Sequence, residues 1–528
     1  MRALAFGGTR RRNAWGAGLA PSEKIWMLGW LFCGAVVWGL VRSTLTNGGV
    51  EYDGVTRAVP VVISVVFMLI FAYPALRSIW SPDRLVWLLG ASVTIGILPK
   101  VPLMPFAREG VHLVLLAGAV GLVCRRVWLG KTIATSPPLQ LYFAYLGICM
   151  ISILVSQVSG LAGAWELKVG VGELILYTAF GLVIAGLAAD RISGSGSPAV
   201  TLIDGFAWAA IAQLLIAPVA ITLAIVSPLV PGNDTLFGMG YWDRVKVTFS
   251  GPDPAGVFFA ASIPLLVWWA SRQRVQIPRM AAMIYLQLAP WFLIASGSRT
   301  GRIAMLVAVG ACLFRRSFRP WILKLLPSLL VAFLIGFFYQ SFPTALKAFG
   351  LAVSGVLHSV LSSDVVNSIF GSDADIGAQT ARDLSGMSLR GHFFQDSERW
   401  RLISETWEFF SAAPFWRQLI GFGVGVGGYR LANYPTSHNF FDLVIETGLI
   451  GVTVFAAFVA VVVFRLARMA RLAVNETQEP DVAFAILIGL IAATLVAATY
   501  EIQTWGIVMA IYAMAIAAIH ADRPLRGK

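Results

Sequence analysis

The chain has 528 residues, of which 58% are hydrophobic and only 13% are charged. A soluble globular domain needs a more polar surface than this, so the composition excludes that class and indicates that lipid is the solvent. The formal net charge of +13 does not indicate a nucleic-acid partner, because the basic residues are scattered between apolar runs and do not line one face.

Long apolar runs recur along the chain and predict membrane-spanning helices. Backbone in lipid must satisfy its own hydrogen bonds, and continuous rather than alternating apolar runs favour helices over a β-barrel. We therefore expect an all-α polytopic membrane protein with about 12 to 14 spans of suitable length. The spans are predicted at residues 24–42, 58–76, 84–100, 108–124, 138–156, 168–188, 202–228, 254–271, 279–296, 301–317, 320–339, 438–464, 481–500 and 503–520.

The first run follows three arginines, Arg10 to Arg12, and no small-residue cleavage site comes after it, so we interpret it as a retained signal anchor. The four cysteines lie inside or at the ends of apolar runs without the spacing of a metal site, which predicts a packing role. They are Cys33, Cys124, Cys149 and Cys312.

Lysine and arginine concentrate in alternate connecting segments, which predicts a cytoplasmic N-terminus. With that orientation, the short turn at residues 296–302 and the large segment at 341–437 lie outside, on the non-cytoplasmic face of the membrane. The predicted organisation has four parts: N-terminal spans (1–200), core spans with the turn (201–340), the large loop (341–437) and C-terminal spans (438–528). A loop of this length is more than a connector.

The large loop contains two segments with apolar residues at helical spacing, residues 345–370 and 398–410. Both are predicted to be amphipathic helices that rest on the bilayer surface. The polar, glycine-containing residues 372–391 between them are predicted to be a flexible connection.

The turn that opens the span at 301 carries Arg299 and Arg302, which are three residues apart and can share one helical face. The N-terminus of a helix already favours anions, and guanidinium groups bind phosphate oxygens bidentately. The pair therefore predicts a diphosphate clamp. The alternative is that both arginines are interfacial and extend to lipid headgroups.

The large loop ends in Ser437-His438-Asn439, and Asp442 and Glu446 follow His438 at intervals of four residues. Acids this close to a membrane are costly unless they are paired or functional. A carboxylate near His438 can orient its ring and raise its pKa, which suits a general base. The alternative is a structural helix start capped by Ser437.

Other arginines of the large loop are candidates for binding the same diphosphate as Arg299 and Arg302. The candidates are Arg399, Arg401 and Arg430. The run at residues 423–428 matches a dinucleotide-binding GxGxxG pattern, but it follows no strand of a βαβ unit. We interpret it as a flexible loop that lets the chain approach a substrate. No acidic cluster has metal-ligand spacing, so neither a metal nor another cofactor is expected.

Together these motifs resemble the O-antigen ligase and O-antigen polymerase superfamily over roughly residues 200–470. The resemblance rests on Ser298-Arg299-Thr300-Gly301, on Gly421-Phe422-Gly423-Val424-Gly425, on Ser437-His438-Asn439-Phe440, and on Glu446-Thr447-Gly448-Leu449-Ile450-Gly451. It implies a fold similar to the membrane glycosyltransferases that use lipid-linked sugars (GT-C type). It also implies a metal-independent, inverting transfer of glycan from undecaprenyl diphosphate in the periplasm.

The resemblance implies Arg299 and His438 as catalytic residues and leaves Arg399 or Arg401 for a second loop arginine. Asp442, Glu446 and Asn439 are expected to support His438, and Arg302 and Arg430 to help bind diphosphate. The acceptor is lipid A core in a ligase, another lipid-linked glycan in a polymerase, or a protein in a third branch, and the sequence leaves this choice open. The alternative class is a polysaccharide transporter or lipid flippase, with Asp204, Lys324 or Glu501 as pathway charges.

Overall fold

The computed structural model describes part of the chain, and all statements below concern these residues. They are residues 19–31, 73, 82–95, 110–128, 136–160, 164–189, 197–226, 239–240, 244–245, 249, 252–338, 407–425, 440–471, 479–497 and 506–521. The predicted surface helix at 345–370, the connection at 372–391 and the predicted span at 58–76, apart from Tyr73, lie outside them.

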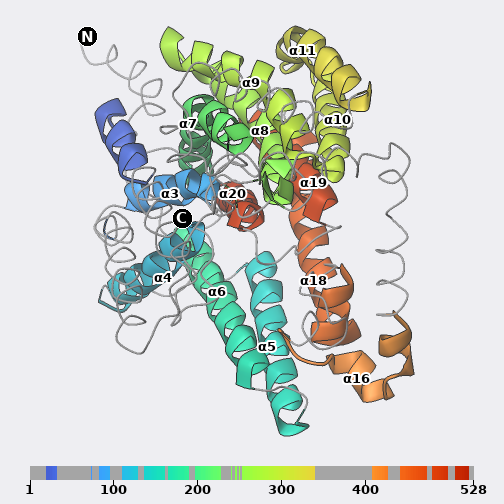
Figure 1. Cartoon of the computed structure of the whole chain (residues 1–528). Helices are drawn as coiled ribbons and strands as arrows, with labels where there is room; N and C mark the ends of the chain where they lie inside the picture. Colours follow the sequence, from blue (N-terminus) through green and yellow to red (C-terminus); the bar gives the residue numbers. More distant parts are fainter. Residues whose placement is uncertain are drawn as a thin grey trace, which may run out of the picture.

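The structure is a bundle of apolar helices, which confirms the all-α polytopic membrane fold (Figure 1). A first helix covers residues 21–31. The others are α3 (Pro82–Ala91), η3 (Ser92–Thr94), α4 (Gly110–Trp128), α5 (Pro137–Val158), α6 (Ala164–Ala189), α7 (Pro198–Val226), α8 (Pro252–Arg272), α9 (Gln276–Ser296), α10 (Arg299–Phe314), α11 (Arg319–Phe338), α16 (Phe415–Ile420), α18 (Phe440–Arg471), α19 (Glu479–Ala497) and α20 (Gly506–Ala521). Two-residue strands, β1 (Met239–Gly240) and β2 (Arg244–Val245), pair antiparallel.

Six described helices are long and apolar enough to cross a membrane. Their spanning parts are Pro137–Val158, Leu167–Gly186, Pro198–Pro218, Pro254–Arg272, Gln276–Ser296 and Leu443–Arg471. Four shorter apolar stretches, Val111–Leu122, Thr300–Phe314, Asp481–Val496 and Ile507–His520, lie at positions where the sequence also predicts spans. Each predicted span from 108 onwards coincides with a helix, whereas the span predicted at 84–100 is replaced by the shorter α3 and η3.

One side of the bundle is held together by Arg315, which makes one ion pair and one hydrogen bond to a carbonyl. Arg315, which follows α10, donates to Asp481 of α19 at 2.8 Å and to the carbonyl of Ala470 in α18 at 3.1 Å. Helices α10 and α18 therefore end where α19 begins, and α19 packs along both of them. Because both run antiparallel to α19, α10 and α18 run in the same direction, and their first residues face the opposite side of the bundle.

The carboxylate of Asp204 in α7 accepts from three donor side chains and links the helix at residues 21–31 to the bundle. The Lys24 ammonium lies 2.7 Å from its carboxylate, and the indole N–H groups of Trp87 and Trp269 donate to it at 2.8 and 3.0 Å. Both charged side chains are mostly buried. Asp204 therefore makes contacts that stabilise the packing of four helices.

We expect Asp204→Ala to lower the stability of the protein by about 3–5 kcal/mol, because it leaves the Lys24 ammonium buried without its counter-charge. The thermal unfolding midpoint in detergent measures the effect. Asp481→Ala is the matched control, because its pair with Arg315 is more exposed and is expected to contribute about 1 kcal/mol or less. Equal midpoints for the two variants would contradict the structural role of Asp204.

Candidate functional site

The predicted turn before residue 301 is present and tightly built. α9 ends at Gly297, which has a left-handed conformation (φ 66°), and the hydroxyl of Ser298 caps α10 by accepting the N–H of Gly301 at 3.2 Å. A Cβ on Gly256 of α8 would lie 2.6 Å from the Ser298 hydroxyl oxygen, so α8 approaches the turn as closely as glycine permits. The turn therefore begins α10 at Arg299, as predicted, and Arg302 is half-buried one helical turn later.

The second motif, residues 421–425, forms what we name the glycine loop, and it docks on α18. The N–H of Phe422 donates to the carbonyl of Ile445 at 2.7 Å, and that of Gly423 to the carbonyl of Glu446 at 3.1 Å. The Glu446 carboxylate in turn accepts the N–H of Gly425 at 2.9 Å. The expectation of a flexible loop is therefore wrong for these residues, because their backbone is hydrogen-bonded to one helix.

Inside a regular helix, each carbonyl accepts a hydrogen bond from an N–H group of the same helix. Because α18 breaks at Gly448, the carbonyls of Ile445 and Glu446 are available to the N–H groups of the glycine loop. Gly448 has φ 66° and ψ −175°, a conformation that other residues rarely adopt. A Cβ on Gly448 would lie 2.3 Å from the carbonyl oxygen of Leu419, and one on Gly421 would lie 2.5 Å from that of Glu446. The two glycine motifs thus form one close backbone contact.

Helices α5 and α6 support this contact from the bundle side. The Ser152 hydroxyl donates to the carbonyl of Glu446, although the two residues are 294 positions apart in the chain. A Cβ on Gly170 of α6 would lie 2.2 Å from the carbonyl oxygen of Val424. The glycine loop is therefore held between the break in α18 and two membrane-spanning helices.

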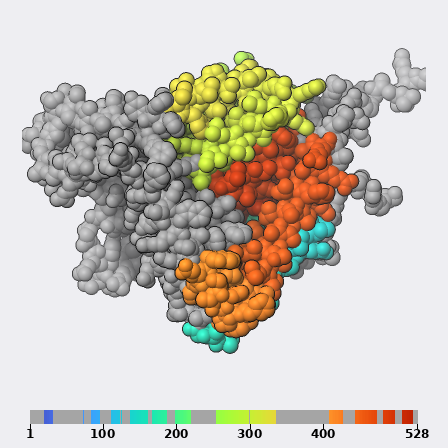
Figure 2. All heavy atoms as spheres, turned by 90° about the vertical axis from the view of Figure 1, so that its right-hand side faces the viewer, coloured from blue at the N-terminus to red at the C-terminus, as the bar shows by residue number. Residues whose placement is uncertain are grey.

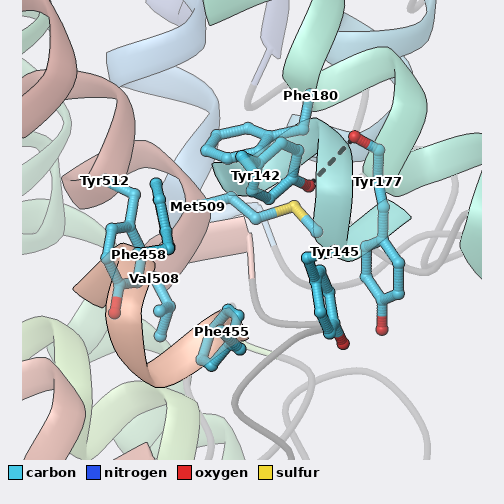
Figure 3. Close-up of a pocket in the computed structure, with 9 residues that line it drawn as sticks. All are labelled: Tyr142, Tyr145, Tyr177, Phe180, Phe455, Phe458, Val508, Met509 and Tyr512. Carbon is cyan, nitrogen blue, oxygen red and sulfur yellow. Dashed lines mark hydrogen bonds between the residues drawn. The ribbon is translucent and has the colours of Figure 1, made fainter. Parts of the chain in front are cut away.

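Next to this contact, an aromatic pocket opens between α5, α6, α18 and α20 (Figure 3). It is lined by Tyr142, Tyr145, Tyr177, Phe180, Phe455, Phe458, Val508, Met509 and Tyr512. The Tyr142 hydroxyl donates to the carbonyl of Tyr177 at 3.0 Å, and the hydroxyls of Tyr145 and Tyr177 point in the same direction. The half-buried carboxylate of Glu446 lies within electrostatic reach of both tyrosines, and that of Glu173 lies within reach of Tyr177. The site thus combines an apolar chamber with acids at one end.

The segment before the glycine loop contains an arginine that the sequence interpretation did not select. Arg417 in α16 is buried, its guanidinium lies 4.1 Å from the ring of Trp416 and 5.6 Å from that of Phe422, and it donates to the Ser159 hydroxyl at the end of α5. Desolvation lowers the pKa of Arg417 from its usual value. No motif distinguishes Arg417 in the sequence, because its burial arises only when residues 407–425 fold onto α5 and α18.

Several predicted site residues lie outside the described residues, namely His438, Asn439, Arg399, Arg401 and Arg430. For Arg299 and Asp442 the structure describes the helical backbone and not the side chain. Glu446 and the half-buried Arg302 are described. Of the predicted second surface helix at 398–410, residues 407–410 are helical, in a helix that continues to residue 412, and the earlier part is not described.

The structure brings the glycine loop and Glu446 together. The Ser298 turn, at the start of α10, lies on the same side of the bundle as the start of α18. Within the described ranges, no group of three His, Cys, Asp or Glu side chains could hold a metal ion.

Residues 283–456 match the family model described as Wzy_C, O-Antigen ligase. This segment, about a third of the chain, is therefore similar to the O-antigen ligase family. It includes α10 with its serine cap, the glycine loop and the break in α18. The family comprises glycosyltransferase-like ligases and polymerases, and its substrates are lipid-linked glycans. A search of curated proteins found no significant match to the chain.

Proposed function

We propose that this O-antigen ligase domain transfers an oligo- or polysaccharide from undecaprenyl diphosphate to an acceptor hydroxyl at the periplasmic face of the inner membrane. The observation that carries the proposal is the docking of the glycine loop on the break at Gly448, inside the segment that matches the family. This contact holds the first two turns of α18, and His438 precedes that helix by two residues in the sequence. A base needs such a fixed support to meet its substrate in one geometry.

The common direction of α10 and α18 supports a shared site. Both helices end at the Arg315 pair, so Arg299 at the start of α10 and Phe440 at the start of α18 face the same side of the bundle. In a membrane protein, this arrangement favours one aqueous face for the arginine turn and the histidine. The second helical turn of α10 adds Arg302, a second cation on that side.

The proposed reaction is an inverting displacement. The imidazole of His438 takes the proton of the acceptor hydroxyl, and the oxygen attacks the anomeric carbon of the donor. The bond between that carbon and the diphosphate oxygen breaks, and undecaprenyl diphosphate leaves with the electron pair. Guanidinium groups of Arg299 and Arg302, with a loop arginine among Arg399, Arg401 and Arg430, stabilise its charge, so the proposal needs no metal. Asp442, Asn439 and Glu446 support the histidine, and Glu446 does so by fixing the Gly425 amide.

The direct test uses the purified full-length chain in detergent with an undecaprenyl-diphosphate oligosaccharide as donor. Lipid A core and a second lipid-linked oligosaccharide are offered separately as acceptors, and products are separated by mass. Product on lipid A core identifies a ligase, and product on the lipid-linked glycan identifies a polymerase. Absence of product with either, together with glycan movement across sealed vesicles, would replace the enzyme by a transporter.

Arg299→Lys is expected to reduce the rate of transfer by about 100-fold, because lysine keeps the charge but cannot form the two-pronged contact with phosphate oxygens. Initial rates at saturating acceptor measure this effect. Arg468→Lys is the matched control, since Arg468 is exposed near the end of α18 on the opposite side of the bundle. Equal rates for Arg299→Lys and the control would argue against a diphosphate clamp at the start of α10.

A further inference from the structure

Arg417 is a buried cation that has no counter-charge among the described residues. Its side chain is only 4% exposed, and its Nη1 atom is buried and makes no hydrogen bond. The ion pairs among the described residues join other side chains, and no described carboxylate pairs with Arg417. A guanidinium removed from water without an anionic partner is costly, so the pattern indicates an anion that binds from outside the chain.

The surroundings of Arg417 indicate where that anion comes from. Phe415 is 71% exposed, and the side chains of Trp407, Trp416 and Phe409 are between 40% and 51% exposed. These aromatic side chains belong to residues 407–420, which lie beside the beginning of α18 at the lower end of the molecule in Figure 2. Exposed aromatic side chains next to the ends of membrane spans are typical of the membrane–water interface.

The two short helices of this segment form a rigid support. The Gln418 side-chain amide donates to the carbonyls of Ser411 and Ala413 at 2.9 Å each. Phe410 and Phe422 are buried in a small apolar cluster with Val444 and Ile445 of α18. The exposed aromatic side chains are therefore presented by a packed unit rather than by a loose loop, next to Ser159 at the end of α5.

We propose that Arg417 and the aromatic side chains around it bind an anionic phospholipid of the surrounding leaflet. The phosphate accepts from the guanidinium of Arg417, and Phe415, Trp416 and Trp407 contact the glycerol and the upper acyl chain. Guanidinium matches phosphate geometry, and the phosphate supplies a negative charge that no described carboxylate provides to Arg417. The bound lipid fixes residues 407–420 at the membrane surface, and this binding does not depend on glycan transfer.

The experiment measures thermal stabilisation of the delipidated full-length protein in detergent. The probes are dioleoyl phosphatidylglycerol, dioleoylglycerol, which has the same chains without phosphate, and inorganic phosphate. Phosphatidylglycerol is expected to raise the unfolding midpoint in a saturable way, and the other two to leave it unchanged at equal concentration. Equal stabilisation by dioleoylglycerol, or none by phosphatidylglycerol, would overturn the proposal without any variant.

Arg417→Gln is expected to weaken phosphatidylglycerol binding about tenfold or more, because a charged hydrogen bond is lost. Arg417→Lys, which keeps the charge, gives an intermediate affinity and covers the case in which the glutamine variant does not fold. Arg468→Gln removes the same charge from an exposed position in α18 and is expected to bind like the wild type. Equal affinities for Arg417→Gln and Arg468→Gln would overturn the assignment to Arg417.

The donor diphosphate is the competing occupant, and the same variants distinguish it. If Arg417 binds phospholipid, Arg417→Gln loses phosphatidylglycerol binding while its KM for the undecaprenyl-diphosphate donor stays within about twofold of the wild type. A large rise in donor KM with unchanged phosphatidylglycerol binding would overturn the lipid assignment and leave the proposed transfer reaction intact.

Discussion

His438→Ala is expected to reduce glycan transfer by about 100- to 10,000-fold, the usual contribution of a positioned general base. Without the imidazole, the acceptor hydroxyl must lose its proton to water while it attacks the anomeric carbon. Expression, membrane insertion and the unfolding midpoint should be unchanged, because His438 precedes α18 and the packed part of that helix begins later. The measurement is the initial rate of transfer with purified protein.

His520→Ala is the matched control for this variant. His520 lies at the end of α20 and contacts the Ser136 hydroxyl at 2.8 Å, on the side of the bundle where α5 begins. The substitution removes a histidine and one hydrogen bond away from the proposed site, so transfer should remain near the wild-type rate. Full activity of His438→Ala would remove the general-base assignment, and equal losses in both variants would indicate a general effect of histidine removal.

Gly448→Ala is expected to release the glycine loop and lower transfer at least about tenfold. The break in α18 requires φ 66°, which costs a residue with a side chain about 1–3 kcal/mol. The new Cβ would also lie 2.3 Å from the Leu419 carbonyl oxygen, which is backbone and cannot rotate away. The contact of Phe422 and Gly423 with α18 must then open, and the support for Glu446 is lost.

The effect of Gly448→Ala is measured in two ways, as the rate of glycan transfer and as the rate of limited proteolysis within residues 407–425. Gly147→Ala in α5 is the matched control, because nothing lies within 4 Å of the Cβ that it would add and its backbone is helical. This control should keep wild-type activity and resistance to protease. A Gly448→Ala protein that behaves like Gly147→Ala would show that the loop contact does not organise the site.

The sequence by itself determined where the helices lie. The span predicted at 138–156 is Pro137–Val158, and the one predicted at 279–296 is Gln276–Ser296. Such agreement is expected, because a helix in lipid must be apolar over its whole length and must satisfy its own backbone hydrogen bonds. The start of α10 was equally predictable, since Ser298 is a local capping residue. The span predicted at 84–100 was wrong over its described part, because residues 84–94 belong to the short elements α3 and η3 instead of one continuous α-helix.

Only the tertiary structure decided which motifs meet. The glycine loop is anchored rather than flexible because the break at Gly448 frees carbonyls in a helix that begins more than ten residues later in the chain. Ser152 completes that contact from 294 residues away, and no local pattern encodes such a pairing. The same holds for Arg417, which looks in the sequence like any other loop cation. Its burial against Trp416 and Phe422, without a carboxylate among the described residues, depends on how distant segments pack. The apolar character of neighbouring residues specifies where helices form. Whether a buried charge such as that of Arg417 has a partner depends instead on residues that are distant in the sequence.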